Sequence, residues 1–429
     1  MKRMLMDELV VWKNKVHRKP LILWGARQVG KTWLMKEFGS EYFENTVYIS
    51  FYNNTHISRI FEQDYDVKRI INDLEVNLHV KIIPGKTLLL FDEVQSAMSV
   101  VESLKYFCED ASEYHVIAAG SLLGVAVHEG ISFPVGKVDE LRLYPLNFRE
   151  YLLAMDEDRL FEYCSNHDLA RVNDFSARYR ELLKVYYCIG GMPEVVSRFI
   201  ENRDYTEARE VQYAITSQYE GDFSKHVTPG ELPRIRMVWE ALPAQLAKEN
   251  RKFFYGQIKK GARQKDFEKA IQWLTDSGIV YRVNKVSKPA MPLKSYVDFA
   301  AFKLFSIDTG LLGAMSELDM ESVLCGNDIF TEFKGALTEQ FVLQQLISDT
   351  DYTPYYFAGE KSTYETDFLI QKKKDIIPIE VKAESNLKSK SLRVYHDKYT
   401  PSISVRVSAS DYVDQGWMKN IPLWCVNVI

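Results

Sequence analysis

The sequence predicts an α/β protein whose N-terminal third contains a mainly parallel sheet. Two observations lead to this prediction. Short apolar runs typical of buried strands recur at residues 21–24, 46–51, 87–91 and 115–119, with stretches of helical periodicity between them. A glycine-containing loop follows the first run and opens a helix, which is an arrangement that binds phosphates in parallel sheets.

The length and composition of the chain limit the kinds of protein that it can be. With 429 residues it is long enough for roughly two to four domains, and its net charge of -5 argues against a uniformly basic nucleic-acid binder. Five cysteines lie at positions 108, 164, 188, 325 and 425, in no CxxC pair or zinc spacing, which favours reduced thiols in a cytoplasm. No apolar run approaches the ~20 residues that cross a bilayer, and the N-terminus lacks a signal-peptide pattern. We therefore expect a cytoplasmic location and no membrane partner.

The sharpest motif is the segment from Gly25 to Thr32, GARQVGKT, which matches G-x-x-x-x-G-K-T. A strand is expected over Leu21–Trp24, and a helix from Lys31 to near Gly39. The glycines let backbone N–H groups face phosphate oxygens, and the helix N-terminus adds positive potential. Lys31 would reach the β- and γ-phosphates, and Thr32 would offer its hydroxyl to Mg²⁺. The residues expected to bind ATP are Gly25, Ala26, Arg27, Gln28, Val29, Gly30, Lys31, Thr32 and Trp33.

Two acids follow the strand expected over Thr87–Phe91. Ligands bind at the carboxyl ends of parallel strands, so Asp92 and Glu93 are placed to meet the phosphates. Asp92 would hold the Mg²⁺ shell, and Glu93 would polarise the attacking water, as in nucleotide-hydrolysing enzymes. Ser121 ends another expected strand, and it either senses the γ-phosphate and orients the water or is a plain turn serine.

These motifs, together with AAGSLLG and the segment DELRLYPLNFREY over residues 139–151, resemble the prokaryotic AAA-type P-loop ATPases that carry an appended C-terminal domain. The resemblance covers essentially the whole chain. It implies an ATPase core over residues 1–152, a helical lid over 153–230, a winged helix-turn-helix over 231–322 and a restriction-endonuclease-like α/β domain over 323–429. An arginine finger usually completes such sites. Lys137, Arg142 and Arg149 are the candidates for that role, and the sequence does not choose among them.

A local excess of positive charge marks residues 248–294, which contain 12 Lys or Arg and four Asp or Glu. Within them a helix is expected over Gln264–Leu274, then a strand over Ile279–Val283, a Pro-rich loop and a second strand over Lys303–Asp308. This order is typical of a winged helix-turn-helix, which predicts binding to double-stranded DNA through phosphates. The alternative is a docking module with a solvated basic face. The residues expected to contact DNA are Lys259, Lys260, Arg263, Lys265 and Lys269.

The tail contains a second set of acids. Glu339 lies within an amphipathic helix expected over residues 333–346, and Asp367 opens a strand that a Lys-rich turn connects to Ile376–Lys382. Strand alternation places Glu380 and Lys382 on one face and the neighbouring apolar side chains in the core. The four residues Glu339, Asp367, Glu380 and Lys382 resemble the PD-(D/E)XK nuclease pattern, with Asp367 and Glu380 expected to hold Mg²⁺. The alternative is an exposed cross-strand charge pair.

The predicted function is therefore Mg²⁺-dependent ATP binding and hydrolysis, coupled to DNA binding through the basic winged helix. One alternative is a Mg²⁺-dependent DNA nuclease that ATP regulates. Another is a nucleotide switch that docks a partner protein. The sequence leaves open whether the chain forms a homo-oligomer, which nucleic acid it binds and which process it serves.

Overall fold

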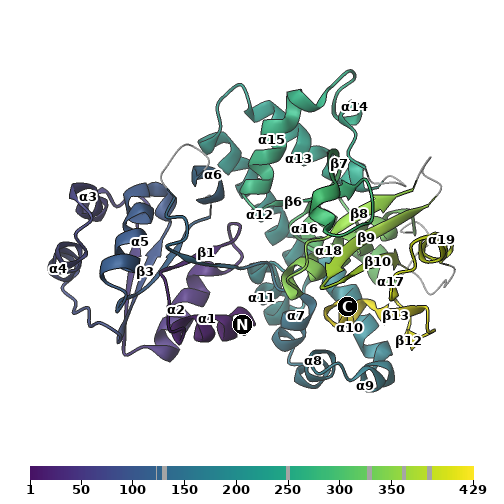
Figure 1. Ribbon diagram of the computed structural model, residues 1–429, viewed down its shortest axis with the longest axis horizontal. Helices are drawn as coiled ribbons and strands as arrows, with labels where there is room; N and C mark the ends of the chain where they lie inside the picture. Colours follow the sequence, from purple (N-terminus) through teal and green to yellow (C-terminus); the bar gives the residue numbers. More distant parts are fainter. Residues whose placement is uncertain (122, 128–132, 248–251, 326–330, 360–363, 384–388) are drawn as a thin grey trace. The chain divides into compact units, whose positions relative to one another are not determined.

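The computed structural model describes residues 1–429 apart from 122, 128–132, 248–251, 326–330, 360–363 and 384–388 (Figure 1). The described chain divides into two compact units. The N-terminal unit holds Arg3–Tyr144 with Asp276–Gly278, and the C-terminal unit holds Met1–Lys2, Pro145–Thr275 and Ile279–Ile429. In the part of the chain that the structure describes, no helix is long and apolar enough to cross a bilayer.

A parallel sheet of five strands forms the centre of the N-terminal unit, in the order β2-β3-β4-β1-β5 (Figure 1). This sheet confirms the predicted α/β class. Strand β4 lies between β1 and β3, so its carboxyl end separates the loop that follows β1 from the acids that follow β3. The strands are β1 (Leu21–Trp24), β2 (Asn45–Ser50), β3 (Thr87–Asp92), β4 (His115–Ala119) and β5 (Asp139–Arg142).

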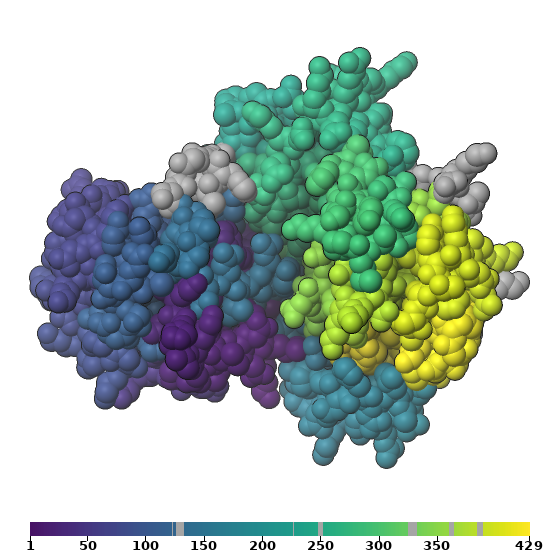
Figure 2. All heavy atoms as spheres, in the orientation of Figure 1, coloured from purple at the N-terminus to yellow at the C-terminus, as the bar shows by residue number. Residues whose placement is uncertain are grey.

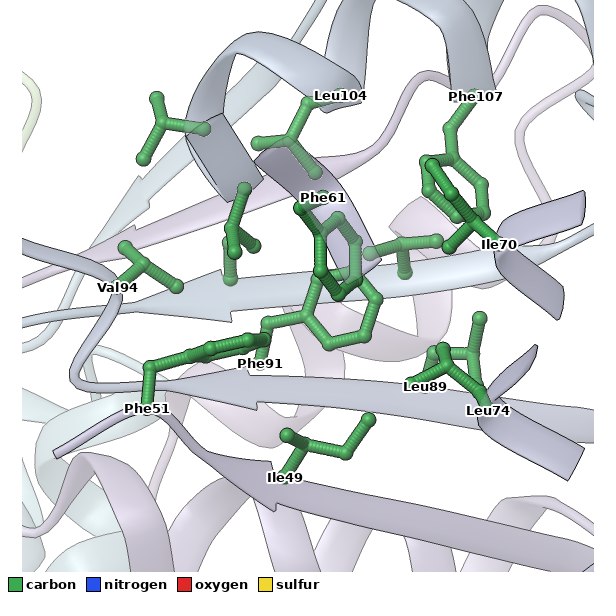
Figure 3. Close-up of a cluster of buried hydrophobic side chains, with 14 of the residues drawn as sticks. Ile49, Phe51, Phe61, Ile70, Leu74, Leu89, Phe91, Val94, Leu104 and Phe107 are labelled. Carbon is green, nitrogen blue, oxygen red and sulfur yellow. The ribbon is translucent and has the colours of Figure 1, made fainter. Parts of the chain in front are cut away.

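A cluster of buried aromatic and aliphatic side chains holds β3 in place (Figure 3). The rings of Phe51, Phe61 and Phe91 meet edge to face, with centroids 5.5 to 5.8 Å apart. Such aromatic pairs add about 0.5–1.5 kcal/mol each beyond the area that they bury. Because Phe91 directly precedes Asp92, this packing also fixes the position of the Asp92 backbone at the end of β3. The helices of this unit are α1 (Leu5–Lys13), α2 (Lys31–Tyr42), α3 (Thr55–Gln63), α4 (Val67–Leu78), η1 (Val94–Ser96), α5 (Met98–Asp110) and α6 (Leu123–Val127).

The C-terminal unit contains a mixed sheet of eight strands, in the order β12-β13-β11-β10-β9-β8-β6-β7. The antiparallel pair β6–β7 comes from the segment predicted as a wing, and it joins the tail strands through parallel pairing of β6 with β8. The strands expected over 279–283 and 303–308 are present with shifted bounds, because β6 ends after the first of these ranges and β7 begins before the second and ends at Ser306. The strands are β6 (Val280–Val286), β7 (Val297–Ser306), β8 (Tyr355–Ala358), β9 (Glu365–Lys372), β10 (Asp375–Lys382), β11 (Ser404–Ser408), β12 (Val413–Asp414) and β13 (Met418–Pro422).

Helices occupy most of the segment from residue 148 to residue 226, with a break between Ile189 and Pro193. The helix expected over 264–274 is also present as α15. The helices of this unit are α7 (Phe148–Ala154), α8 (Asp158–Ser165), α9 (Leu169–Asp174), α10 (Ser176–Ile189), α11 (Pro193–Asn202), α12 (Tyr205–His226), α13 (Leu232–Leu246), α14 (Tyr255–Ile258), α15 (Gln264–Asp276), η2 (Leu293–Tyr296), α16 (Thr309–Met315), α17 (Met320–Cys325), α18 (Thr331–Asp349), α19 (Lys390–Tyr399) and η5 (Leu423–Val428).

Helix α18 differs from the amphipathic helix that the sequence predicts, because residues 336–346 are buried on every side. Its glutamines hydrogen-bond to the backbone of other segments, which offsets the cost of burying their amides. The amide of Gln340 both donates to Ser306 O at 2.7 Å and accepts from Ser306 N at 2.9 Å. The Oε1 atom of Gln345 accepts from Phe148 N at 2.7 Å. A polar side chain on this helix therefore does not mark a solvent-facing side.

Candidate functional site

Two glycines, Gly25 and Gly30, shape the backbone of the loop between β1 and α2. Gly25 has a φ of 151° and Gly30 a φ of 96°, and both lie in the region that side chains disfavour. A Cβ atom added at Gly25 would lie 2.5 Å from the carbonyl oxygen of Leu143, so a larger residue does not fit. Helix α2 begins at Lys31, and no side chain caps its first turn. The first N–H groups of a helix point out of its N-terminus, where they suit an anion.

Lys31 is folded back over this loop. Its ammonium donates to Gly25 O at 2.8 Å and to Ala26 O at 2.7 Å, and the side chain is buried. Burial lowers the pKa of Lys31 to about 8, although the negative charges of Glu93 and Asp92 oppose this shift. The two acids thus favour the protonated form of this buried amine.

Asp92 lies at the end of β3 and receives hydrogen bonds from three segments. Thr32 Oγ1 donates to Asp92 Oδ2 at 2.6 Å, and Tyr48 Oη of β2 donates to the same oxygen at 3.0 Å. The backbone N–H of Glu93 donates to Asp92 Oδ1 at 3.0 Å. Burial and the negative charge of Asp92 raise the pKa of Tyr48 to about 12, so its hydroxyl stays protonated near neutral pH. Tyr48 belongs to no sequence motif, but strand alternation with the apolar Val47 and Ile49 could have indicated that its side chain points away from the core.

Glu93 adopts a left-handed backbone conformation, with a φ of 55°, directly after β3. Its Oε2 atom accepts a short hydrogen bond from the side-chain amide of Gln95, and Ser121 Oγ donates to it at 3.3 Å. Ser121 reaches Glu93 because β4 is the neighbour of β3. The structure thus brings together the three predicted residues Asp92, Glu93 and Ser121. Gln95 had no motif that could have identified it.

The remaining residues of the predicted ATP-binding set differ in their exposure to solvent. Ala26 and Val29 are buried, so their side chains pack inside the N-terminal unit while their backbone forms part of the loop. Arg27 is exposed, and Trp33 is exposed on α2, while Gln28 takes a left-handed conformation with a φ of 66°.

The three candidates for an arginine finger have different environments. Lys137 forms an ion pair with Glu109 at 2.7 Å. Arg149 forms a mostly buried ion pair with Asp349 at 2.7 Å, which makes it a structural residue of the C-terminal unit. Arg142 is exposed at the end of β5, in register with Trp24 of β1. Arg142 therefore lies on the strand next to the one that precedes the loop.

In the tail, the structure places three of the predicted residues together on β9 and β10. The ladder pairs Ile379 with Phe368, which leads directly to Glu380 opposite Asp367. Asp367 Oδ2 accepts from the N–H of Val381 at 2.7 Å, and Lys382 Nζ lies 3.0 Å from Glu380 Oε1.

The alternative of an exposed charge pair is wrong about exposure, because Glu380 is 5% exposed, although Glu380 and the partly exposed Lys382 do form an ion pair. Sequence alternation suggested that one face of β10 is solvated, but residues 377–381 are buried on both faces. Both faces of the strand are therefore covered. Burying a charged carboxylate costs free energy unless a positive charge or a hydrogen-bond donor lies beside it. The nearby ammonium of Lys382 supplies such a charge.

Glu339 lies in a different charged group. It is buried on α18, with Lys303 Nζ of β7 at 3.9 Å, and the same ammonium lies 2.7 Å from Glu365 of β9. Within the described residues, no group of three or more His, Cys, Asp or Glu side chains could hold a metal ion. No sequence pattern connects Lys303 with Glu339, since they belong to segments predicted to lie in different domains.

The five basic residues predicted to contact DNA are all exposed, in and around α14 and α15 (teal in Figure 2). The opposite face of α15 is apolar, and its residues Phe267, Ala270, Ile271 and Leu274 are buried. Lys269 also lies 3.3 Å from Glu231, which is an exposed ion pair of small energetic value. The five residues are Lys259, Lys260, Arg263, Lys265 and Lys269.

Comparison with known protein families gives a match for the N-terminal part of the chain. Residues 17–152 match the AAA domain family. The parallel sheet, the glycine loop and the acids at the end of β3 lie within this matched segment, and the match supports a P-loop ATPase domain of the AAA type there. Two further segments match families described as domains of unknown function, DUF8612 over residues 180–322 and DUF4143 over residues 334–426.

Solved structures resemble the chain at low identity. The Walker-type ATPase PABY2304 of Pyrococcus abyssi is 13% identical, with 73% of this chain and 95% of that chain covered and a TM-score of 0.47. The ORC1 protein of Aeropyrum pernix, solved in complex with DNA, is 12% identical, with 73% and 90% covered and a TM-score of 0.28. AMPPCP-bound DnaA of Aquifex aeolicus is 13% identical, with 64% and 86% covered and a TM-score of 0.29. The search among curated proteins gave no match.

Proposed function

We propose that this chain binds ATP with Mg²⁺, hydrolyses it and couples hydrolysis to DNA binding through its basic segment. The observation that carries the proposal is the contact of Thr32 Oγ1 with Asp92 Oδ2 at 2.6 Å, beside the buried ammonium of Lys31. These residues come from the start of α2 and the end of β3. Their convergence puts the three functional groups that a triphosphate with a divalent ion requires at one edge of the sheet.

The residues present fit Mg²⁺, because a hydroxyl and a carboxylate are hard oxygen donors. Thr32 and Asp92 would hold the ion, which when bound neutralises charge on the phosphates. Lys31 would exchange its bonds to Gly25 O and Ala26 O for phosphate oxygens. The N–H groups of the loop and of the first turn of α2 would orient the same phosphates.

Glu93 would accept a proton from the attacking water. Ser121 and Gln95 both donate to its Oε2 atom, so they orient this carboxylate. General-base catalysis of this kind contributes about 10²–10⁴-fold to a rate.

DNA binding is the second part of the proposal. The order α13, α14, α15, β6, β7 is that of a winged helix-turn-helix, and the basic residues of α15 and the segment before it are exposed. Exposed lysines and arginines that neutralise phosphates supply affinity without sequence preference. The cytoplasmic location and the division into four domains stay predictions.

Phosphate release and nucleotide binding test the proposal. The purified chain is given ATP and Mg²⁺ with and without duplex DNA, beside Lys31→Ala and the control Lys68→Ala, which changes an exposed lysine of α4. We expect hydrolysis in the wild type and in Lys68→Ala, and none above background in Lys31→Ala. Tight ATP binding without phosphate release would instead favour the nucleotide switch. A wild type that neither binds nor hydrolyses ATP would overturn the proposal.

A second candidate function is Mg²⁺-dependent DNA cleavage by the tail. The contact of Asp367 with Val381 N–H and of Lys382 with Glu380 favours it, because two carboxylates and an ammonium then lie together. Plasmid nicking is measured for the wild type, Asp367→Asn and the control Asp375→Asn, which changes an exposed acid of the same hairpin. Nicking that is lost in Asp367→Asn and kept in Asp375→Asn would support cleavage. Equal nicking in all three proteins, or none in any, would exclude it.

A further inference from the structure

Tyr48 lies at the edge of the sheet and reaches the end of the neighbouring strand. Its register partner on β3 is Leu90, two residues before Asp92. Even so, Tyr48 Oη lies 3.0 Å from Asp92 Oδ2, since the side chain extends along the strand direction toward the carboxyl end of β3. We infer that Tyr48 is a positioning residue that holds Asp92 for Mg²⁺. This inference rests on the proposed ATP site and adds to it a residue that no motif contains.

The bonding around Asp92 is the first argument. Its Oδ2 atom accepts from two hydroxyls, those of Thr32 and Tyr48, while its Oδ1 atom accepts from the N–H of Glu93. Thr32 is also expected to bind the metal, so its hydroxyl has two tasks. The hydroxyl of Tyr48 donates to Asp92 and also has a side-chain hydrogen bond with Ser50, and no metal task is assigned to it. The tyrosine therefore provides a bond to the carboxylate that does not depend on Thr32.

The second argument is that Tyr48 is itself held in place. The ammonium of Lys36 on α2 lies 3.9 Å from the centroid of its ring. Cation–π contacts of this kind favour one ring orientation. The flanking residues Val47 and Ile49 are buried in the core, so the backbone of β2 at this position is anchored. Tyr48 is 37% exposed, yet Lys36 contacts its ring and Asp92 accepts from its hydroxyl. Core packing alone does not account for this arrangement.

Removing a residue that orients a metal ligand typically lowers metal affinity about 10–100-fold. Tyr48→Phe deletes the hydroxyl and keeps the ring and its contact with Lys36. The loop that grips the phosphates does not include Tyr48. We therefore expect the substitution to leave metal-free ATP binding unchanged and to raise the Mg²⁺ concentration at half-saturation about tenfold.

The experiment uses the full chain and a fluorescent ATP analogue. Binding is titrated once in EDTA and once as a function of Mg²⁺, for the wild type, Tyr48→Phe and the control Tyr52→Phe, whose ring is 65% exposed just beyond β2. The expected result is a shift in the Mg²⁺ titration of Tyr48→Phe alone. An unshifted titration would overturn the inference. So would equal weakening in EDTA and in Mg²⁺, because it would assign Tyr48 a general structural role. A wild type that does not bind the analogue would instead refute the ATP site itself, and the inference with it.

Discussion

Thr32 and Asp92 are 60 residues apart in the sequence, and the hydroxyl of the first lies 2.6 Å from the carboxylate of the second. The contact connects the first turn of α2 with the end of β3. It arises because parallel strands direct their carboxyl ends to one edge of the sheet, where both the loop after β1 and the acids after β3 emerge. The ATP site can therefore be tested residue by residue.

Glu93→Gln should separate binding from hydrolysis. The amide keeps the size of the side chain but cannot take a proton from water, so we expect ATP to bind normally and phosphate release to fall about 100-fold or more. Binding by calorimetry and release in a steady-state assay measure the two effects. The control is Glu113→Gln, an exposed acid of the same unit. Hydrolysis within twofold of the wild type would show that Glu93 is not the base.

Arg149→Ala should destabilise the C-terminal unit and leave nucleotide chemistry intact. Asp349 is 3% exposed on its side chain, and removing the guanidinium leaves this buried carboxylate with less compensation, at a cost of about 3–5 kcal/mol. Denaturant unfolding at neutral pH measures the loss. Arg171→Ala, which removes an exposed pair with Asp174, should cost less than about 1 kcal/mol. A stable Arg149→Ala protein with hydrolysis reduced about 10³-fold would instead make Arg149 an arginine finger.

Lys303→Met should also be strongly destabilising. It removes the buried ammonium from Glu365 and Glu339, and the loss of one partner of a buried ion pair costs about 3–5 kcal/mol. Changing both acids to glutamine in the same protein should recover most of that stability, since no buried charge then remains at these three positions.

The matched control for Lys303 is Lys419→Met, whose ammonium lies 3.8 Å from the partly exposed Asp414. Thermal unfolding of the four proteins compares them directly. If Lys303→Met unfolds at the wild-type temperature, the ammonium has no structural role in coupling β7 to the tail.

His115 should make the N-terminal unit less stable in mild acid. Burial, aided by the positive charge of Arg18, lowers the pKa of His115 from 6.5 to about 4. The unfolded chain therefore binds a proton between these values and the folded chain does not, so the free energy of unfolding decreases as pH falls. Linkage gives a loss of about 2 kcal/mol between pH 7 and pH 5.

Urea unfolding at both pH values measures this loss in the wild type and in His115→Phe, whose ring would keep the edge contacts with Trp12 and Phe43. The variant should lose about 2 kcal/mol less than the wild type over the same interval. His17→Phe, at an exposed position, should behave as the wild type does. An identical pH dependence in all three proteins would contradict the assignment.

Removal of basic side chains from α15 should weaken DNA binding in a salt-dependent way. For Lys265→Ala with Lys269→Ala, we expect the slope of log K against log salt to fall by about 2, with similar effects on unrelated sequences. Fluorescence anisotropy with a labelled duplex at several salt concentrations measures the slope. The control replaces two exposed lysines of the N-terminal unit, Lys68 and Lys105. Equal slopes for both double variants would remove α15 from the interface.

Local patterns were sufficient for much of the fold. The apolar runs that predict β1, β3 and β4 became strands, and the helix predicted from Lys31 begins at that residue. The motif from Gly25 to Thr32 and the acids after β3 could be found because each is contiguous. A contiguous motif depends on short-range sterics and hydrogen bonds, which neighbouring residues determine.

Other features depend on which segments become neighbours. Tyr48 and Gln95 join the site through strand register and the turn after β3, and neither carries a motif. The amphipathic interpretation of residues 333–346 was wrong because glutamines on α18 bond to distant backbone groups, so polarity did not mean exposure. Glu380 is buried for the same kind of reason, since the covering of both faces of β10 is not encoded in β10 itself.

The sequence by itself determined that a phosphate-binding loop and an acid pair follow strands of a parallel sheet, because strand, loop and helix preferences act over a few residues. Only the tertiary structure decided that β4 separates these strands, that Lys303 meets Glu339 and Glu365, and that Tyr48 reaches Asp92. These contacts join segments tens of residues apart. They depend on sheet order and packing, which are properties of the whole folded chain.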